Sequence, residues 1–218
     1  DGVPIHIIKP GKQIDIGTYT IEFIPVSHSV PDSSALSIKT KHGTVLHSGD
    51  WNLDPAPVLG PKTDEKRLKE IGEEGVLAYI GDSTNAQVDG VTGSESDVAK
   101  GMAAEFKQAK GKIAVTIFAS NIGRLISISK AAHEAGRSVV LIGRSLHRMT
   151  AAAHECGYMD DLPDFLNKDD LPHIADENLV LVVTGSQGEH RAALERIARG
   201  EHRQVSLKRG DTVIFSLN

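Results

Sequence analysis

The stretch KIAVTIFASNIGRLISISKAAHEAGRSVVLIG, residues 112–143, decides the fold class. A short apolar run comes first, an amphipathic segment follows over 122–136, and a second apolar run over 138–142 ends at a glycine. Apolar runs of this length, alternating with amphipathic segments, are typical of parallel strands whose connecting helices lie on the faces of the sheet. The stretch therefore predicts a strand-helix-strand unit of an α/β domain.

The same alternation continues on both sides of this unit. Amphipathic segments predict further helices and short apolar runs predict further strands. The expected helices span 94–111, 145–157 and 190–200, and the expected strands span 178–186 and 211–217. Residues 94–218 therefore predict a parallel sheet with helices on both faces.

The first part of the chain has a different pattern. Residues 18–26, TYTIEFIPV, alternate as a half-buried strand does, and the runs 35–40 and 43–49 predict a hairpin that turns at residues 41–43. A short amphipathic helix is expected over 64–75 because Gly75 follows its last apolar position.

The next apolar run, VLAYI from residue 76, predicts a buried strand that ends in polar residues. After it the segment 86–94 is polar and rich in glycine, which is typical of a linker. We therefore expect two domains, over residues 1–93 and 94–218.

Composition narrows the classes of function. With 218 residues, 39% of them hydrophobic, the chain can bury a sizeable core. The net charge of -5 gives no global attraction to phosphate, so binding of nucleic acid would depend on a local groove. The single cysteine, Cys156, excludes an internal disulfide, and we expect a buried, unreactive thiol and a cytoplasmic protein. No apolar run is long enough to span a bilayer, so no membrane partner is expected.

Polar residues gather in three turns that each follow a predicted strand. In an open parallel sheet, ligands bind beyond the carboxyl ends of the strands, where helix N-termini offer free N–H groups to an anion. The serines of these turns could instead cap the helices that follow. The residues alone leave both interpretations open. The candidate phosphate- and RNA-binding residues are Ser120, Asn121, Arg124, Arg144, Ser145, Ser186, Gln187 and Glu189.

A basic stretch follows the last of these turns. It contains Arg191, Arg196, Arg199, Arg203, Lys208 and Arg209. These side chains would neutralise a few phosphates if they shared one face, but their helical spacing equally fits a solvated surface.

Six motifs, in this order, resemble the ribonuclease J family, a group of nucleases with a metallo-β-lactamase fold and a β-CASP domain. They are SHSVPDS (27–33), HSGDWNLD (47–54), GDSTNA (81–86), FASNIGR (118–124), GRS (143–145) and TGSQGE (184–189). The resemblance covers nearly the whole chain. It implies the C-terminal part of a metallo-β-lactamase domain over 1–93, followed by a β-CASP domain over 94–218 that ends incomplete.

The resemblance also implies a function and a cofactor. Members of the family are bacterial or archaeal endonucleases and 5′-to-3′ exonucleases that process and degrade RNA, including ribosomal and messenger RNA, with two zinc ions. The partners implied are an RNA substrate and a further copy of the protein, in a homo-oligomer. A two-zinc hydrolase needs imidazole ligands and a carboxylate shared by both ions.

By position in the motifs, His28 resembles a zinc-ligating histidine and Asp50 the bridging carboxylate, with Asp82 a further catalytic acid. We expect two adjacent strand ends to bring His28 and Asp50 together. His47 is expected to hydrogen-bond a ligand or the loop. Without the resemblance, His28 and Asp50 would be interpreted as ordinary loop residues.

The chain also departs from the family pattern. The family's His-x-His-x-Asp-His segment and its later histidines are absent from these 218 residues. We therefore expect an internal part of the enzyme that is inactive alone and holds no tight zinc pair. Two alternatives stay open: a metal-free module that binds RNA or phosphate, and a small-molecule hydrolase of the metallo-β-lactamase type.

Overall fold

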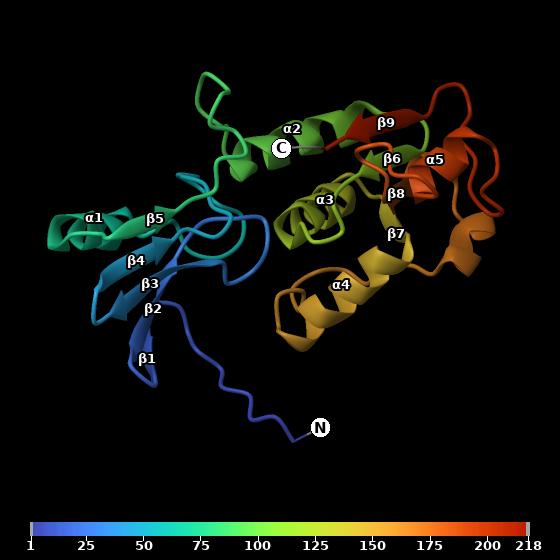
Figure 1. The fold of residues 1–218 in the computed structure, drawn as a ribbon. Helices are drawn as coiled ribbons and strands as arrows, with labels where there is room; N and C mark the ends of the chain where they lie inside the picture. Colours follow the sequence, from blue (N-terminus) through green and yellow to red (C-terminus); the bar gives the residue numbers. More distant parts are fainter. Residues whose placement is uncertain (1, 217–218) are drawn as a thin grey trace. The chain divides into compact units, whose positions relative to one another are not determined.

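The computed structural model describes residues 2–216 and divides the chain into two compact units, Asp1–Ser94 and Glu95–Asn218. The division falls one residue after the expected boundary. Each unit has its own sheet (Figure 1).

The sheet of the first unit has the order β1-β2-β3-β4-β5. Its strands are β1 (Gln13–Ile16), β2 (Tyr19–Pro25), β3 (Ser34–Thr40), β4 (Gly43–His47) and β5 (Ala78–Ile80). The first four strands pair antiparallel, and β5 pairs parallel with β4. The predicted hairpin is β3-β4: Thr40 pairs with Gly43, whose φ of 138° strongly favours glycine.

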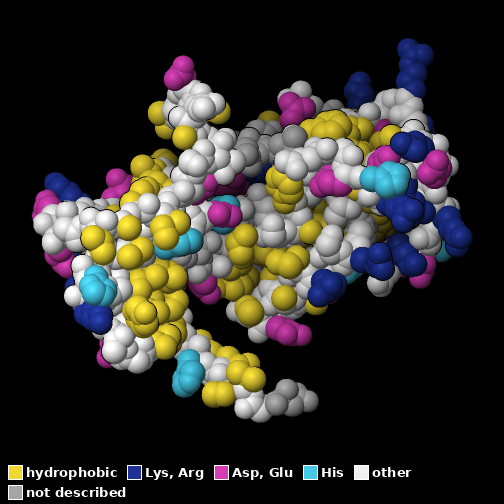
Figure 2. Space-filling model, viewed as in Figure 1, with side chains coloured by type: hydrophobic (Ala, Val, Ile, Leu, Met, Phe, Trp, Pro, Cys, Tyr) yellow, Lys and Arg dark blue, Asp and Glu magenta, His cyan; other side chains and the backbone are white. Residues whose placement is uncertain are grey.

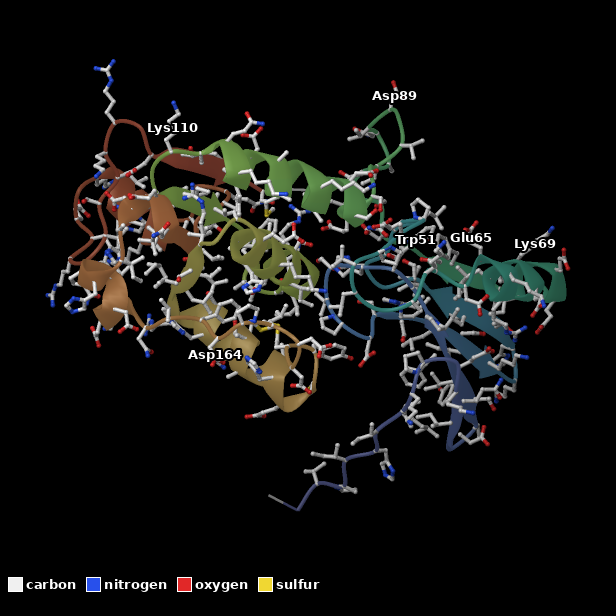
Figure 3. The ribbon with its side chains drawn as sticks, turned by 180° about the vertical axis from the view of Figure 1, so that it is seen from behind. Trp51, Glu65, Lys69, Asp89, Lys110 and Asp164 are labelled. Carbon is white, nitrogen blue, oxygen red and sulfur yellow. The ribbon has the colours of Figure 1, made fainter. Side chains whose placement is uncertain are left out.

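Helix α1 (Glu65–Glu74) covers one face of this sheet. Ile71 is buried in a cluster with Ile24, Val26 and Ala35, and the ring of Trp51 packs against this cluster. Figure 3 shows Glu65 and Lys69 of α1 on the side away from the sheet. Burial of these apolar side chains fixes α1 on the strands.

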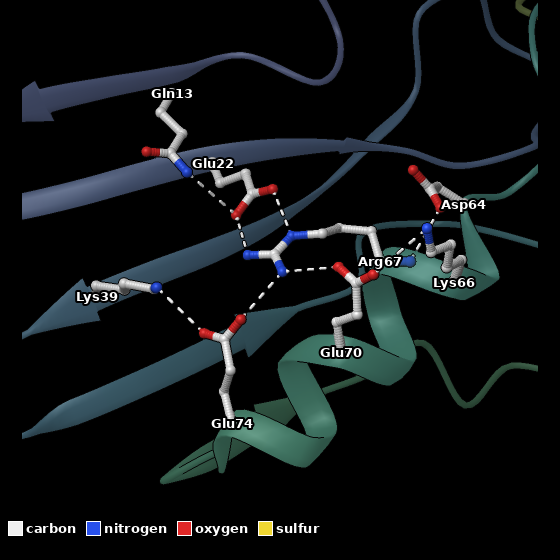
Figure 4. A network of polar contacts seen from close by, with 8 residues as sticks. All are labelled: Gln13, Glu22, Lys39, Asp64, Lys66, Arg67, Glu70 and Glu74. Carbon is white, nitrogen blue, oxygen red and sulfur yellow. Dashed lines mark hydrogen bonds and ion pairs between the residues drawn. The ribbon is translucent and has the colours of Figure 1, made fainter.

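An ion-pair network also joins α1 to the sheet (Figure 4). Arg67 Nε donates to Glu22 Oε1 at 2.7 Å and Nη2 donates to Glu22 Oε2 at 2.9 Å, a bidentate pair from helix to strand β2. Arg67 Nη1 also donates to Glu70 at 3.1 Å and to Glu74 at 3.0 Å. Lys39 Nζ of β3 donates to Glu74 at 3.2 Å. Hydrogen bonds from Arg67 lower the pKa of the Glu22 carboxyl.

The second unit is the α/β domain predicted from residues 112–143. Its sheet has the order β7-β8-β6-β9 and all three pairings are parallel. The strands are β6 (Ile113–Thr116), β7 (Ser138–Ile142), β8 (Leu179–Val183) and β9 (Thr212–Phe215). The helices are α2 (Glu95–Gln108), α3 (Ile122–Glu134), α4 (Arg144–Glu155) and α5 (Ala193–Ala198), with the 3-10 turns η1 (Lys168–His173) and η2 (Asp176–Asn178).

Both faces of this sheet are covered, as predicted. Every residue of β8 is buried. Leu181 on one face clusters with Leu194 and Ile197 of α5. Val180 and Val182, whose side chains alternate to the other face, are also fully buried. Helices α2 and α3 pack side by side, and α3 contacts β7 (Figure 1).

Three local predictions are wrong. Strand β5 is exposed rather than buried, because it lies at the edge of its sheet with Tyr79 57% exposed. Cys156 is exposed, since it follows α4 as its C-terminal cap. Helix α5 begins at Ala193 rather than residue 190, because Arg191 has a φ of 65° and Ala192 is extended.

Among residues 2–216, no helix combines the length and apolar character needed to cross a membrane.

Candidate functional site

Two loops of the first unit bring His28 and Asp50 together. His28 follows β2 and Asp50 follows β4. Since β2 and β4 both run antiparallel to β3, they run in the same direction, and their carboxyl ends lie on the same side of the sheet. His28 Nε2 lies 3.9 Å from Asp50 Oδ2. The prediction that the two strands are adjacent is wrong, because β3 lies between them.

The buried hydroxyl of Thr63 holds these two loops in register. Thr63 Oγ1 accepts a hydrogen bond from the Ser27 N–H at 2.9 Å and donates to the Asn52 carbonyl at 2.6 Å. The Asn52 N–H donates directly to the Ser27 carbonyl at 2.9 Å. Ser27 adjoins His28, and Asn52 lies two residues after Asp50. Trp51 anchors the same loop through the core cluster (Figure 3).

Ser48 makes a similar link to the loop of Asp82. The Ser48 N–H donates to the Ile80 carbonyl at 2.9 Å, and Ser48 Oγ accepts from the Asp82 N–H at 2.9 Å. Hydrogen bonds from the hydroxyl and N–H of Thr84 lower the pKa of Asp82, and His28 adds a smaller electrostatic contribution. His28, Asp50 and Asp82 therefore belong to one cluster of loops. Ser48 and Thr63, which organise it, lack any sequence signal of their own beyond a polar residue at a strand or loop end.

The donor chemistry of this cluster suits a divalent cation, but the number of donors does not. Imidazole nitrogen and carboxylate oxygen are zinc ligands, and a stable site needs at least three per ion. Among residues 2–216, no group of three or more His, Cys, Asp or Glu side chains is arranged to hold a metal ion. The described residues do not form a complete zinc site.

His47 stabilises the loop that carries Asp50. Its Nδ1 accepts a hydrogen bond from the Gly49 N–H at 3.0 Å, and its side chain is exposed. Gly49 has a φ of 61°, a conformation that favours glycine. The imidazole and this glycine thus shape the turn between β4 and Asp50.

In the second unit, the first of the three predicted turns contains a side chain that binds an N–H group at the start of α3. Asn121 caps α3, and its Oδ1 accepts from the Arg124 N–H at 2.8 Å. Neither Ser120 nor Ser145 caps a helix by its side chain, because Asn121 and Gly143 occupy the cap positions. The capping interpretation is therefore wrong for these two serines.

Arg124 is 1% exposed and is used inside the domain. Its Nε and Nη2 donate to the two carboxylate oxygens of Glu95, at 2.9 and 2.6 Å, and its Nη1 donates to the hydroxyl of Ser216. A buried, bidentate arginine joins α2, α3 and the end of β9. This placement does not fit the predicted phosphate contact.

The third turn is also partly closed. The Gln187 N–H donates to Glu189 Oε2 at 2.9 Å, so this N–H is not free for an anion. Ser186 is buried, and its hydroxyl has no hydrogen-bond partner among the described residues. Ser186 follows Thr184 and Gly185 rather than opening a helix. It therefore does not cap one.

The second turn opens onto a cavity of about 980 Å³, which we call the basic pocket. It lies beyond the carboxyl ends of β7 and β8, the position expected for a ligand in a parallel sheet. Figure 2 shows Lys and Arg side chains gathered where Figure 1 has α5 and η1. Its polar lining residues are Arg144, Ser145, His147, Arg148, Lys168, Thr184, Arg191, Arg196, His202 and Gln204.

The lining of the basic pocket is positively charged. Among the residues that the structure describes, no Asp or Glu lines it. The side chains of Arg144, Arg148 and Lys168 form no ion pair within residues 2–216. His202 adds little charge near neutral pH, because burial and the nearby Arg196 lower its pKa. Arginine and lysine therefore supply the positive potential.

Sequence reasoning found part of this pocket. Arg144 and Ser145 came from the strand-end argument, and Arg191 and Arg196 from the basic stretch. Arg148 and Lys168 were missed, although Arg148 lies one helical turn after Arg144 and so on the same face. In contrast Arg199 pairs with Glu195 at 2.8 Å, outside the pocket.

Comparison with known proteins identifies the class of domain that the second unit forms. A family model described as "Ribonuclease J, beta-CASP domain" matches residues 110–218, which places a β-CASP domain in the second unit. A solved structure of a protein of unknown function from Enterococcus faecalis V583 is similar over 97% of this chain and 57% of that one, with a TM-score of 0.58 and 14% identity. That likeness concerns the fold alone.

The chain belongs to the ribonuclease J family. It is 46% identical over 214 residues to the ribonuclease J of Sinorhizobium meliloti, covering 98% of this chain and 38% of that protein. It is 37% identical to the ribonuclease J of Thermus thermophilus, covering 96% of this chain and 37% of that protein. The chain thus spans a little over a third of the length of these relatives.

Proposed function

We propose that the protein containing this chain is a metal-dependent ribonuclease that hydrolyses RNA phosphodiester bonds, both internally and from the 5′ end, in RNA processing and decay. The similarity to ribonuclease J over 98% of the chain carries the proposal. The loop cluster supports it, because His28 and Asp50 face each other across 3.9 Å at one edge of a sheet.

In this proposal the first unit contributes part of a two-zinc centre. His28 would be a ligand, Asp50 the shared carboxylate and Asp82 an acidic neighbour, with the other ligands outside these 218 residues. Bound zinc would supply an activated water for attack on phosphorus. What the chain itself does is narrower: Thr63 and Ser48 hold the donor-bearing loops in fixed positions. Residues 1–218 alone would retain no tight zinc pair and cleave no RNA.

The test is Asp50→Ala in the full-length protein, assayed with 5′-monophosphorylated RNA with and without a chelator. Loss of a shared carboxylate should lower both metal content and cleavage. RNA affinity should stay within about tenfold, since phosphate contacts carry most of it. Thr44→Ala, at an ordinary position of β4, is the matched control. Full zinc content and near-normal cleavage in Asp50→Ala would refute the metal role of Asp50.

A metal-free RNA-binding module is the second candidate, and the basic pocket favours it. Such a module would bind RNA equally with and without chelator and would never cleave it. A small-molecule hydrolase has no observation in its favour once a β-CASP domain is present. We further propose a cytoplasmic homo-oligomer, for which native mass measurement and cell fractionation are the tests.

A further inference from the structure

A second pocket of the α/β unit lies beside the amino end of β8, and we call it the leucine pocket after Leu171, Leu179 and Leu181 in its lining. Its volume is about 460 Å³. Small-molecule sites usually have volumes of about 300–1,000 Å³. We propose that the leucine pocket binds a small monocarboxylate with a short apolar body.

The walls of the leucine pocket are held by Lys112, whose side chain is 11% exposed. Lys112 Nζ donates to the Ser206 carbonyl at 2.9 Å and pairs with Asp176 at 3.2 Å. Asp176 also pairs with Lys208, and hydrogen bonds from Lys208 and Lys112 lower the pKa of its carboxyl. These contacts join the loop before β9 to η2, so the pocket is formed without a ligand.

Two exposed cations of the lining, Lys168 and Arg203, stand apart from this network. Neither side chain forms an ion pair within residues 2–216. Gln204 Nε2 donates to Asp169 Oδ1 at 3.4 Å, which joins the two segments that carry these cations. Lys168 and Arg203 therefore belong to one part of the rim, where a carboxylate would gain charge-assisted hydrogen bonds.

The rest of the lining selects for an apolar body and against a polyanion. Leu179, Leu181 and Val205 belong to the core cluster, and Leu171 packs against it partly buried. A hydrocarbon chain bound there would leave water, which favours binding. The carboxylates of Asp169 and Asp176 also line the pocket and would repel a highly charged ligand. One negative charge on an apolar body fits this lining best.

The leucine pocket shares Lys168 and Gln204 with the basic pocket. A carboxylate bound to Lys168 would neutralise one cation of the basic pocket. We therefore expect a ligand in the leucine pocket to weaken RNA binding. This consequence, unlike the site itself, rests on the proposed function.

The experiment is saturation-transfer NMR on the full-length protein, titrated with sodium octanoate, octylamine or sodium acetate. Octanoate should bind with a Kd of about 1 mM or lower, as expected for a ligand of its size. Octylamine carries the opposite charge and acetate lacks the apolar chain. Each of them should therefore bind more weakly than octanoate, by about tenfold or more.

Substitutions in the lining separate the two parts of the site. Arg203→Ala should weaken octanoate binding about tenfold, because a charge-assisted hydrogen bond is lost, and Arg203→Lys should recover most of this loss. Leu171→Asn should weaken binding about fivefold by making a partly buried apolar position polar. Arg209→Ala is the matched control, since Arg209 is exposed in the same basic stretch and does not line the pocket.

The effect on RNA is measured by fluorescence anisotropy with single-stranded RNA, with chelator present so that no cleavage occurs. Octanoate should weaken RNA binding about threefold in the parent and in Arg209→Ala, because one cation is withdrawn from the phosphates. In Arg203→Ala the same concentration of octanoate should have little effect. Acetate at equal concentration controls for ionic strength.

The outcomes distinguish the site from the proposed function. Equal binding of octanoate and octylamine, or octanoate binding that survives both Arg203→Ala and Leu171→Asn, would overturn the site. Octanoate binding without any effect on RNA affinity would overturn the coupling through Lys168. Octanoate binding that depends on Arg203 and Leu171, in a full-length protein without nuclease activity, would support the site and refute the proposed function.

Discussion

Arg67 in the first unit and the arginines of the basic pocket in the second unit show two opposite uses of the same side chain. Arg67 donates to three carboxylates, and its own side chain is 23% exposed. Among the described residues, no Asp or Glu lines the basic pocket beside its arginines. A cation whose partners lie within the chain stabilises the fold, whereas a cation without partners is available to a ligand. Substitutions should therefore affect stability in the first region and binding in the second.

The largest loss of stability is expected on substitution of Arg124. The second unit thus also contains an arginine that is paired within the chain. Arg124→Ala would leave Glu95 without its bidentate partner inside the domain, at a cost of about 3–5 kcal/mol. Hydrogen exchange of the α3 and β6 amides in the full-length protein measures this loss. Arg148→Ala is the control and should leave that exchange unchanged. Normal exchange in Arg124→Ala would show that burial of Arg124 contributes nothing to stability.

A smaller loss is expected at Arg67. Arg67→Ala removes the donors to Glu22, which is 9% exposed, and the cost should be about 2 kcal/mol. Hydrogen exchange in α1 and β2 should rise accordingly, while RNA affinity stays unchanged. Lys66→Ala provides the control, since Lys66 is exposed on the same helix and its one ion pair among the described residues is with Glu70, at 3.8 Å. If Arg67→Ala instead lowered RNA affinity and left hydrogen-exchange protection unchanged, Arg67 would be a binding residue rather than a stabilising one.

The Arg67 network should also make the first unit sensitive to acid. Hydrogen bonds from Arg67 hold the pKa of Glu22 below its ordinary value of 4.5. This contribution to stability is complete above about pH 4.5 and is lost as the pH falls through the folded-state pKa. Hydrogen exchange of β2, corrected for intrinsic rates, should therefore rise below that pH in the parent protein. Glu22→Gln should show a flatter dependence on pH, and an identical dependence would contradict the assignment.

Periodicity in the sequence predicted most of the fold of the second unit. The run 112–143 gave a strand, a helix and a strand because its strands are buried on both faces and its helix is amphipathic. The exposure of β5 could not be predicted, since an apolar run carries no record of which strand lies at the edge of a sheet. The late start of α5, at Ala193, depends on backbone angles at Arg191 and Ala192 that neither residue type favours.

The candidate site was predictable to a different extent in each unit. The motif resemblance selected His28 and Asp50, and the structure brings them together through Thr63, a contact between residues far apart in sequence. Arg124 and Arg144 looked equivalent in the sequence, since each follows a strand-end turn. Only the three-dimensional contacts distinguish them, because the partner of Arg124 lies 29 residues before it, at Glu95. Charge in a sequence does not show whether it is neutralised.

The smallest effect tests the comparison most directly, because stability and binding should change in opposite directions. Arg144→Glu places an acidic residue in the first turn of α4 and removes the repulsion between Arg144 and Arg148. The helix should gain about 0.5 kcal/mol, seen as slower hydrogen exchange in α4. RNA binding should weaken and its salt dependence should decrease, because one phosphate contact is replaced by a like charge. Arg144→Gln should lie between the parent and Arg144→Glu in both measurements. If Arg144→Glu instead destabilises α4 and leaves RNA binding intact, Arg144 is a structural residue like Arg67 and does not bind RNA.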